Sequence, residues 1–228
     1  MKYITPKQMS LVDDLGNGKY QISLDQMMEN EAINFTNFIL SLKKKPKKVF
    51  IIYGIGNNGA GGLTLARHLA IKDFQVYIIP ADTKQKNRQV VKKRLATLKN
   101  VKIIPENKEI LNKASLNDLI VDCIFGYNAK GAPRSPVDKI IEKANSLKKK
   151  GVKIASLDLP SGIDPLTGEK YKPHIEANYT LTLAFPKTGL KNIKNVYLVN
   201  IGIPNSLYKD LKLTAKVNFK NSNILKIQ

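Results

Sequence analysis

A glycine-rich turn follows a strongly apolar segment in residues 49–62 of this 228-residue chain. Because glycine has no Cβ atom, the backbone of such a turn can approach a phosphate closely, and the free N–H groups at the start of the next helix point at the negative charge. Gly54, Gly56 and Gly59 also match the dinucleotide-binding pattern Gly-x-Gly-x-x-Gly, with Asp82 beyond the next strand as a candidate ribose partner. The stretch therefore predicts a nucleotide-binding turn. A structural turn without a ligand is the alternative.

Two aspartates, Asp122 and Asp158, end apolar segments of strand length. In a parallel sheet the carboxyl ends of the strands meet at one edge, so both carboxylates are candidates for acid–base chemistry there. Aspartate is also a common turn former, and that alternative stays open for each residue. The oxygens of Asn58, Asp122 and Ser161 lie at strand ends on the same side and could hold a hard cation, although spacing alone does not establish such a site.

Other chemistries find less support in the sequence. Ser161 lacks the Gly-x-Ser-x-Gly context of a hydrolase nucleophile, and only His68 and His174 are present as bases. Neither histidine has the spacing of a transition-metal ligand. The single cysteine, Cys123, cannot form an internal disulfide and is expected to be a buried thiol, which agrees with a reducing compartment.

Segments of strand length alternate with segments of helical periodicity along the chain. Ser23 and Gln26 form a capping-box pattern ahead of a long amphipathic helix that ends before Pro46. A second helix follows the glycine turn. The other predicted elements are strands at residues 49–53, 76–79, 101–104, 119–124, 154–157, 179–185 and 196–201, and helices at 87–98 and 137–149. The alternation predicts an α/β fold with a parallel sheet, and the residues from Thr214 onward give no pattern.

Four loops should gather at the carboxyl ends of these strands, which is where such sheets bind ligands. They are the glycine turn, the loop of residues 125–134, the loop of residues 158–162, and the loop after Phe185 that contains Lys187. Lys187 is a candidate for holding a phosphate or a hydroxyl group, and a surface lysine is its alternative role.

The composition is that of a soluble globular protein, with 43% hydrophobic and 25% charged residues, and it predicts one domain over residues 1–228. No apolar run approaches the roughly 20 residues of a membrane span, and the first residues do not resemble a secretory signal, so a cytoplasmic protein is expected. The net charge of +20 comes mainly from lysine, which favours solvated helix faces over a nucleic-acid surface.

Several ordered motifs resemble the NAD(P)H-hydrate epimerase family, also called the YjeF N-terminal domain family, and the similarity covers most of the chain. The motifs are Met27-Met28-Glu29-Asn30, Gly56-Asn57-Asn58-Gly59, Ala66-Arg67-His68-Leu69, Val121-Asp122-Cys123-Ile124-Phe125-Gly126, Lys130-Gly131 with Arg134, Asp158-Leu159-Pro160-Ser161-Gly162-Ile163-Asp164, Thr180-Leu181-Thr182-Leu183-Ala184-Phe185-Pro186-Lys187 and Gly202-Ile203-Pro204.

The resemblance implies a Rossmann-like three-layer α/β/α sandwich with a mostly parallel central sheet, usually dimeric. It also implies an isomerase that interconverts the R and S forms of hydrated NADH or NADPH. A potassium ion would be held by Asn58, Asp122 and Ser161, and Asp158 is our candidate acid–base residue. The implied substrate contacts are Asn57, Asn58, Gly59, Ala60, Gly61, Gly126, Tyr127, Asn128, Ala129, Lys130, Gly131, Ala132, Asp158 and Lys187. A separate NAD(P)H-hydrate dehydratase is the expected functional partner.

The chain departs from the family in the glycine turn, which there reads Gly-Asn-Asn-Gly-Gly-Asp-Gly. Ala60 and Gly61 stand where the last Gly-Asp should be, so a carboxylate is missing. Losing a charged hydrogen bond would weaken binding by roughly 1 to 3 kcal/mol. This departure favours the alternative of a catalytically silent nucleotide- or RNA-binding scaffold domain. An ordinary NAD-dependent dehydrogenase is less supported, because the fingerprint has no matching catalytic residues.

Overall fold

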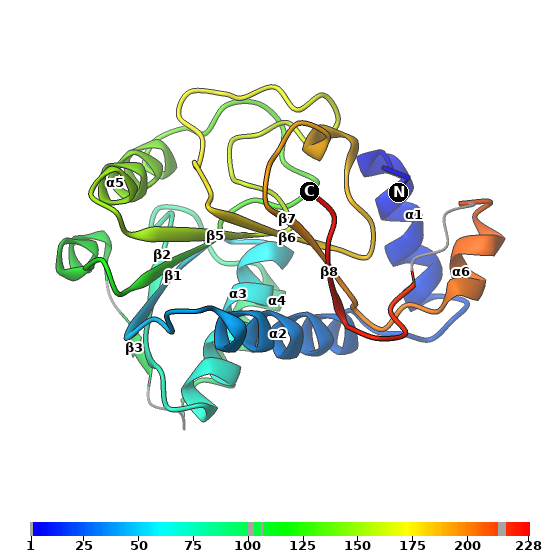
Figure 1. Ribbon diagram of the computed structural model, residues 1–228, viewed down its shortest axis with the longest axis horizontal. Helices are drawn as coiled ribbons and strands as arrows, with labels where there is room; N and C mark the ends of the chain where they lie inside the picture. Colours follow the sequence, from blue (N-terminus) through cyan, green and yellow to red (C-terminus); the bar gives the residue numbers. More distant parts are fainter. Residues whose placement is uncertain (1, 100–102, 106, 214–217) are drawn as a thin grey trace.

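An eight-stranded β-sheet forms the centre of the computed structural model, which describes residues 2–99, 103–105, 107–213 and 218–228 (Figure 1). The strands lie in the order β3-β2-β1-β4-β5-β6-β7-β8, and all neighbours are parallel except the antiparallel pair β7 and β8. Their bounds are β1 Lys48–Tyr53, β2 Gln75–Pro80, β3 Ile103–Pro105, β4 Leu119–Cys123, β5 Lys153–Leu157, β6 Tyr179–Leu183, β7 Val196–Val199 and β8 Ile224–Lys226. The predicted mostly parallel sheet is confirmed.

Helices cover both faces of the sheet, which gives the predicted three layers (Figure 1). One face carries α2 (Leu24–Ser41), α3 (Asn57–Ile71) and α4 (Gln89–Ala96), and the other carries α5 (Val137–Lys149) and the 3₁₀ helix η1 (Lys108–Lys113). The helices α1 (Pro6–Asn17) and α6 (Asn205–Asp210) pack beside the β7 end, and the short η2 (Thr188–Leu190) follows β6. No helix within the described residues is both long and apolar enough to cross a membrane.

Strand β1 shows why the sheet is buried on both sides. Val49 and Ile51 face the α2–α3 layer, whereas Phe50 and Ile52 face α5, and all four are fully buried. Successive side chains of a strand point to opposite faces, so a strand covered on both faces reads as a continuous apolar run. The neighbouring Cys123 is a buried free thiol, as predicted.

The packing of α2 against α3 is fixed by three of the family motif residues. The Glu29 carboxylate of α2 accepts hydrogen bonds from Arg67 Nη2 at 2.6 Å and pairs with His68 Nε2 at 2.8 Å, both on α3. The start of α2 is set by the predicted capping box, in which Ser23 Oγ accepts the Gln26 N–H and Gln26 Oε1 accepts the Ser23 N–H. These contacts hold one side of the α2–α3 layer in register.

Five elements were not predicted, namely α1, α6, β8 and the two 3₁₀ helices η1 and η2. Helix α1 has its own capping box between Thr5 and Gln8, and Pro6 stands at its first position. Both are local sequence signals for the start of a helix. Helix α6 and strand β8 are short, and β8 exists through its pairing with β7. Of the predicted strand 101–104, residues 103 and 104 lie in β3, and residues 101 and 102 lie outside the described residues.

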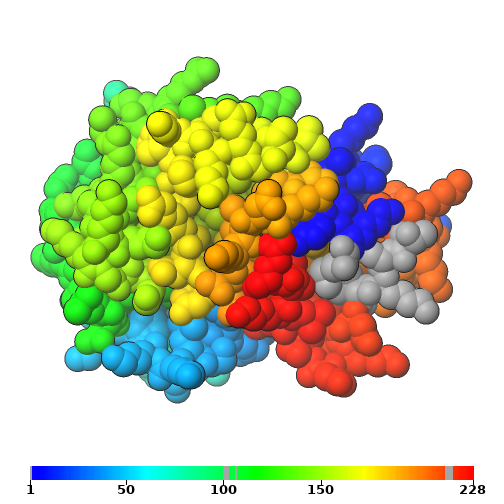
Figure 2. Space-filling model, turned by 45° about the horizontal axis from the view of Figure 1, so that its top comes forward, coloured from blue at the N-terminus to red at the C-terminus, as the bar shows by residue number. Residues whose placement is uncertain are grey.

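The two ends of the chain lie side by side on one face (Figure 2). Ile4 forms a parallel bridge with Lys187, and Tyr3 Oη accepts a hydrogen bond from the Gln228 side chain. The N-terminal segment is therefore attached to the loop after β6, close to the carboxyl ends of the strands. The expectation of one domain over residues 1–228 stays a prediction.

Glycine is required in the turn after β1 because backbones approach each other there. A Cβ atom on Gly59 would overlap the Gly54 carbonyl oxygen and lie 2.6 Å from its carbon, and one on Gly54 would lie 3.0 Å from the carbonyl carbon of Ile124. By contrast, no atom lies within 4 Å of a Cβ on Gly56, the N-cap of α3. Glycines 54 and 59 thus let β1, β4 and α3 meet closely.

The close approach at Gly59 predicts a difference between two alanine variants. Gly59→Ala should lower the free energy of unfolding by about 2 kcal/mol or more, because the added carbon has no room in a packed interior. Gly56→Ala is the matched control and should change it by no more than about 1 kcal/mol, the usual effect at an N-cap. Urea denaturation measures both. Equal effects of the two variants would contradict the role given to Gly59.

Candidate active site

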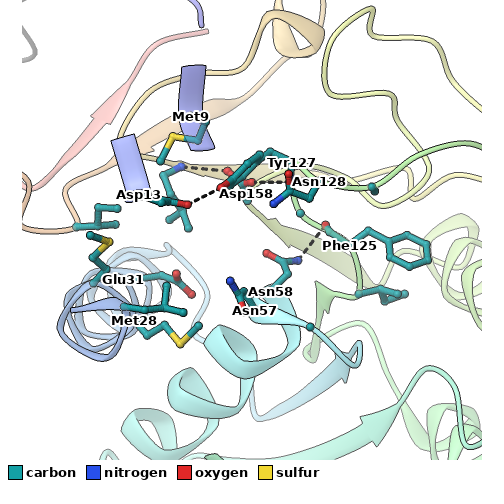
Figure 3. Close-up of a pocket in the computed structure, with 18 of the residues that line it drawn as sticks. Met9, Asp13, Met28, Glu31, Asn57, Asn58, Phe125, Tyr127, Asn128 and Asp158 are labelled. Carbon is teal, nitrogen blue, oxygen red and sulfur yellow. Dashed lines mark hydrogen bonds between the residues drawn. The ribbon is translucent and has the colours of Figure 1, made fainter. Parts of the chain in front are cut away.

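A cavity of about 310 Å³ opens at the carboxyl ends of the central strands (Figure 3). Its walls come from α1, α2, the start of α3, and the loops after β4, β5 and β6. The lining residues are Met9, Asp13, Leu24, Met27, Met28, Glu31, Ile55, Gly56, Asn57, Asn58, Arg88, Ile124, Phe125, Gly126, Tyr127, Asn128, Ala129, Asp158, Leu183, Lys187 and Ile201. The cavity therefore lies where the four loops were predicted to gather.

A second hollow, of about 380 Å³, adjoins the first and shares four lining residues with it, Ile55, Ile124, Phe125 and Ala129. It is lined further by the predicted Lys130, Gly131 and Ala132, and by Asp82 and Arg134. Asp82 Oδ1 accepts the backbone N–H groups of Lys84 and Gln85, so this carboxylate orders its own turn. Its role toward a ribose stays a prediction.

The predicted contact residues separate into three places. Eight line the first cavity: Asn57, Asn58, Gly126, Tyr127, Asn128, Ala129, Asp158 and Lys187. Lys130, Gly131 and Ala132 line the second hollow. Gly59, Ala60 and Gly61 are buried in the first turns of α3, behind the cavity wall, and are not among the lining residues of either hollow. Contact of these three residues with a substrate stays a prediction.

Asp158 lies directly after β5 in the left-handed backbone region, with φ of 66°. Such a conformation is unfavourable for a residue with a side chain and persists only where surrounding contacts hold it. Here Asp158 Oδ2 accepts the Tyr127 N–H at 3.1 Å, and Oδ1 accepts the Leu183 N–H at 3.4 Å. The carboxylate is thereby directed at the edge of the cavity.

Lys187 is fully buried, which makes its alternative role as a surface lysine wrong. Its Nζ donates to Asp158 Oδ1 and, at 3.0 Å, to the Leu183 carbonyl oxygen, and lies 5.6 Å from the centre of the Tyr127 ring. A buried lysine needs an anion and further hydrogen bonds to stay charged. The Asp158–Lys187 pair therefore holds a carboxylate and an ammonium group together at the cavity wall.

The three candidate potassium ligands are linked through Phe125, and of the three Asn58 lines this cavity. The Asn58 amide nitrogen donates to the Phe125 carbonyl oxygen at 3.0 Å, and the Phe125 N–H donates to Ser161 Oγ at 3.0 Å. Ser161 Oγ in turn donates to Asp122 Oδ1 at 2.6 Å. Asp122 also accepts Ser156 Oγ–H and the Ser161 N–H, and burial raises the pKa of this carboxyl.

Two further carboxyl groups in the cavity wall were not singled out from the sequence. Asp13 reaches in from α1 and accepts a hydrogen bond from the Tyr127 hydroxyl, and Glu31 reaches in from α2 (Figure 3). Burial raises the pKa of Asp13 and raises that of Glu31 well above its usual range, with the nearby Asp158 charge adding to the effect on Glu31. Both positions had a signal, since α1 has a capping box and Glu31 interrupts the apolar stripe of α2.

A parallel sheet whose first strand turns through glycines into a helix, with a cavity at the strands' carboxyl ends, places the molecule among the Rossmann-like α/β proteins. The family model described as "YjeF-related protein N-terminus" matches residues 24–189. The chain belongs to this family, as the motifs predicted.

Relatives support the assignment over nearly the full length. An Entamoeba histolytica protein named NAD(P)H-hydrate epimerase is 32% identical over 232 residues, covering 96% of this chain and 100% of the relative. A Dictyostelium discoideum protein of the same name is 33% identical, covering 98% of this chain and 94% of the relative.

Two other matches define the fold and the wider context. The crystal structure of the yeast protein YNL200c superposes with a TM-score of 0.84 and 23% identity, covering 100% of both chains, which confirms the fold. A Methanopyrus kandleri protein named bifunctional NAD(P)H-hydrate repair enzyme is 26% identical over 89% of this chain, but the chain spans only 42% of that relative. In such proteins this fold is one part of a longer enzyme.

The buried ion pair predicts strong energetic coupling between its two residues. Lys187→Met should lower the free energy of unfolding by about 3 to 5 kcal/mol, because it leaves the Asp158 carboxylate buried without its partner. The double variant Lys187→Met, Asp158→Asn should recover part of that loss. Denaturation of the two single variants and the double variant completes the cycle. Strictly additive effects would mean that the two side chains do not stabilise each other.

Proposed function

We propose that this protein interconverts the R and S epimers of hydrated NADH or NADPH in the cavity at the carboxyl ends of its strands. The observation that carries the proposal is the Asp158–Lys187 pair, which presents a carboxylate and an ammonium group at the wall of that cavity. The full-length relatives named NAD(P)H-hydrate epimerase support it. So does the start of α3 at Asn57, which lines the first cavity, because a helix N-terminus favours a phosphate.

The reaction inverts a ring carbon that bears both a nitrogen and a hydroxyl group, and it needs one proton to move in each direction. In one route, a proton is delivered to the hydroxyl group, the carbon–oxygen bond breaks, and water leaves as the ring nitrogen lone pair forms a carbon–nitrogen double bond. Water then adds to the opposite face and returns the proton. We assign the proton transfers to Asp158, held in place by Lys187 and the Tyr127 N–H: its carboxylate takes a proton from the Lys187 ammonium group, delivers it to the hydroxyl group, and takes one back when water adds, which restores the ion pair. A positioned carboxylate can serve a ring-opening route as well.

The test follows both epimers of hydrated NADH by chiral-resolving chromatography, with the uncatalysed rate subtracted. The native protein should equilibrate them, and Asp158→Asn should lower kcat/KM by about 100-fold or more, the usual contribution of a positioned acid–base group. Asp73→Asn is the matched control, because Asp73 is exposed at the end of α3 and its φ of 61° also suits asparagine. Circular dichroism verifies that each variant is folded.

Two outcomes would oppose the assignment. A native chain that leaves the epimers unchanged would favour the silent scaffold domain with the same fold. Full activity in a folded Asp158→Asn variant would remove the acid–base role from Asp158 and leave the family function to another residue.

We also propose that Asn58, Asp122 and Ser161 hold a potassium ion. The donor set fits a hard monovalent cation, because each residue offers oxygen atoms. Asp122 is a fully buried carboxyl, and among the described residues no ion pair includes it, so a cation would offset its charge. When bound, the ion would supply positive charge next to the cavity, because Asn58 and Phe125 line it.

Potassium binding predicts a salt-specific stabilisation. At a potassium concentration 100 times the dissociation constant, linkage raises the free energy of unfolding by about 2.7 kcal/mol, which should shift the melting temperature by several degrees. Thermal melts in potassium chloride and in N-methylglucamine chloride at equal ionic strength measure this shift. Asn58→Ala should reduce it. Identical melting temperatures in the two salts would argue against a potassium site.

The wider partners follow from the relatives. Because the bifunctional relatives combine this fold with further sequence in a repair enzyme, we infer a functional link to an NAD(P)H-hydrate dehydratase. Formation of a homodimer stays a prediction.

A further inference from the structure

The missing side chain at position 61 leaves a space that another residue occupies. A Cβ atom on Gly61 would overlap Oε1 of Glu31 and would lie 3.1 Å from both Glu31 Cδ and Leu157 Cδ2. Position 61 lies in the first turns of α3, and Glu31 lies in the middle of α2. The Glu31 carboxyl group therefore takes the volume that any side chain at position 61 would need.

Glu31 is an unusual residue for its position. It lies on the buried stripe of α2, with 6% of its surface exposed, and its Oε1 has no hydrogen-bond partner among the described residues. A buried carboxyl oxygen without a partner is destabilising, and apolar residues normally fill such a stripe. The side chain also lines the cavity, where it faces Asn57 and Asn58 from the α2 side (Figure 3).

Glu31 lies on a helix that is held firmly against its neighbour, and several charges surround it. The hydrogen bonds of Glu29 to Arg67 and His68 hold α2 against α3 half a turn away. The pKa of the Glu31 carboxyl is affected by burial and by the charges of Asp158 and Asp13. The charges of Lys187 and Arg94 act in the opposite direction. Burial and the charges of Asp158 and Asp13 raise its pKa, which favours the protonated form. A protonated carboxyl can both donate and accept a hydrogen bond, which suits a hydroxyl group.

We propose that Glu31 is a substrate-binding residue whose carboxyl group hydrogen-bonds a hydroxyl group of the nucleotide in the first cavity, and that glycine at position 61 is what admits it. The proposal rests on the proposed function for the identity of the nucleotide. In the family turn an aspartate stands at the position of Gly61. The carboxyl group is therefore present in this chain, but it comes from α2 instead of α3.

Four proteins test the proposal: the native chain, Glu31→Ala, Gly61→Asp and the double variant Glu31→Ala, Gly61→Asp. Isothermal titration calorimetry with NADH and with hydrated NADH measures affinity, urea denaturation measures stability, and chromatography of the epimers measures activity. Thr36→Val is the matched control, because Thr36 Oγ1 is another buried, unpartnered polar atom of α2 and lies outside the cavity lining.

Glu31→Ala should stay folded and bind hydrated NADH about tenfold to a hundredfold more weakly, the effect of losing a hydrogen bond to a carboxyl group. Gly61→Asp alone should be less stable and bind more weakly than the native chain, because its side chain fits only if the Glu31 carboxyl group moves from its place in the cavity wall. The double variant should fold and regain affinity, because the carboxyl returns from α3 into the space that Glu31 leaves. Thr36→Val should bind as the native chain does.

The ligands separate the two sources of the hydroxyl group. Equal weakening toward NADH and hydrated NADH assigns the contact to a ribose, and weakening toward the hydrate alone assigns it to the hydrated ring. A folded Glu31→Ala variant that binds both ligands as tightly as the native chain would overturn the proposal. If the native chain binds nucleotide through Glu31 but does not interconvert the epimers, the proposed function fails and the binding role stands.

Discussion

The ion pair between Asp158 and Lys187 is the interaction on which the geometry of the cavity depends. Asp158 ends β5 in a left-handed conformation, and Lys187 belongs to the loop after β6, whose Ala184 also has a positive φ of 58°. The backbone of Lys187 pairs with Ile4, and the Asp158 carboxylate accepts the Tyr127 N–H. One buried contact thus joins the loops after β4, β5 and β6 to the N-terminal segment. Because a buried charge without its partner is strongly destabilising, these segments have few alternative arrangements.

The electrostatics of the cavity follow from the same pair. Three carboxyl groups, those of Asp13, Glu31 and Asp158, share a small volume with Lys187. Three negative charges around one buried ammonium group would be unfavourable, and burial, which raises the pKa values of Asp13 and Glu31, acts against that arrangement. The cavity therefore presents the Asp158 carboxylate, paired with Lys187, beside two carboxyl groups whose protonated form is favoured by burial. This combination suits a ligand rich in hydroxyl groups better than one that is only anionic.

Local sequence patterns were enough to predict most of the fold, because strands buried on both faces and capped amphipathic helices carry strong periodic signals. The position of Asp158 at the end of a parallel strand could also be predicted from the sequence. Its pairing with Lys187 could not be predicted, because the pairing depends on the φ of Asp158 and on how deeply the next loop is buried. The capping box would have been enough to predict helix α1, but it could not show that Asp13 enters the site, because this depends on the packing of α1 against the β7 end. The short β8 likewise exists through pairing alone.

At Gly61 the sequence motif and the three-dimensional structure lead to different conclusions about the missing carboxylate. Along the chain, the loss of the family aspartate suggests a silenced site. In space, Glu31 fills the place where a side chain at position 61 would lie. In a domain without a ligand, a buried carboxyl with an unpartnered oxygen would only destabilise the fold, and an apolar residue would pack better at that point of α2. The carboxyl instead faces the cavity that Asp158 and Lys187 define, so the penalty is relieved when a ligand supplies its hydrogen bond. Helix α2 thus brings to the cavity a carboxyl group that the glycine turn before α3 lacks.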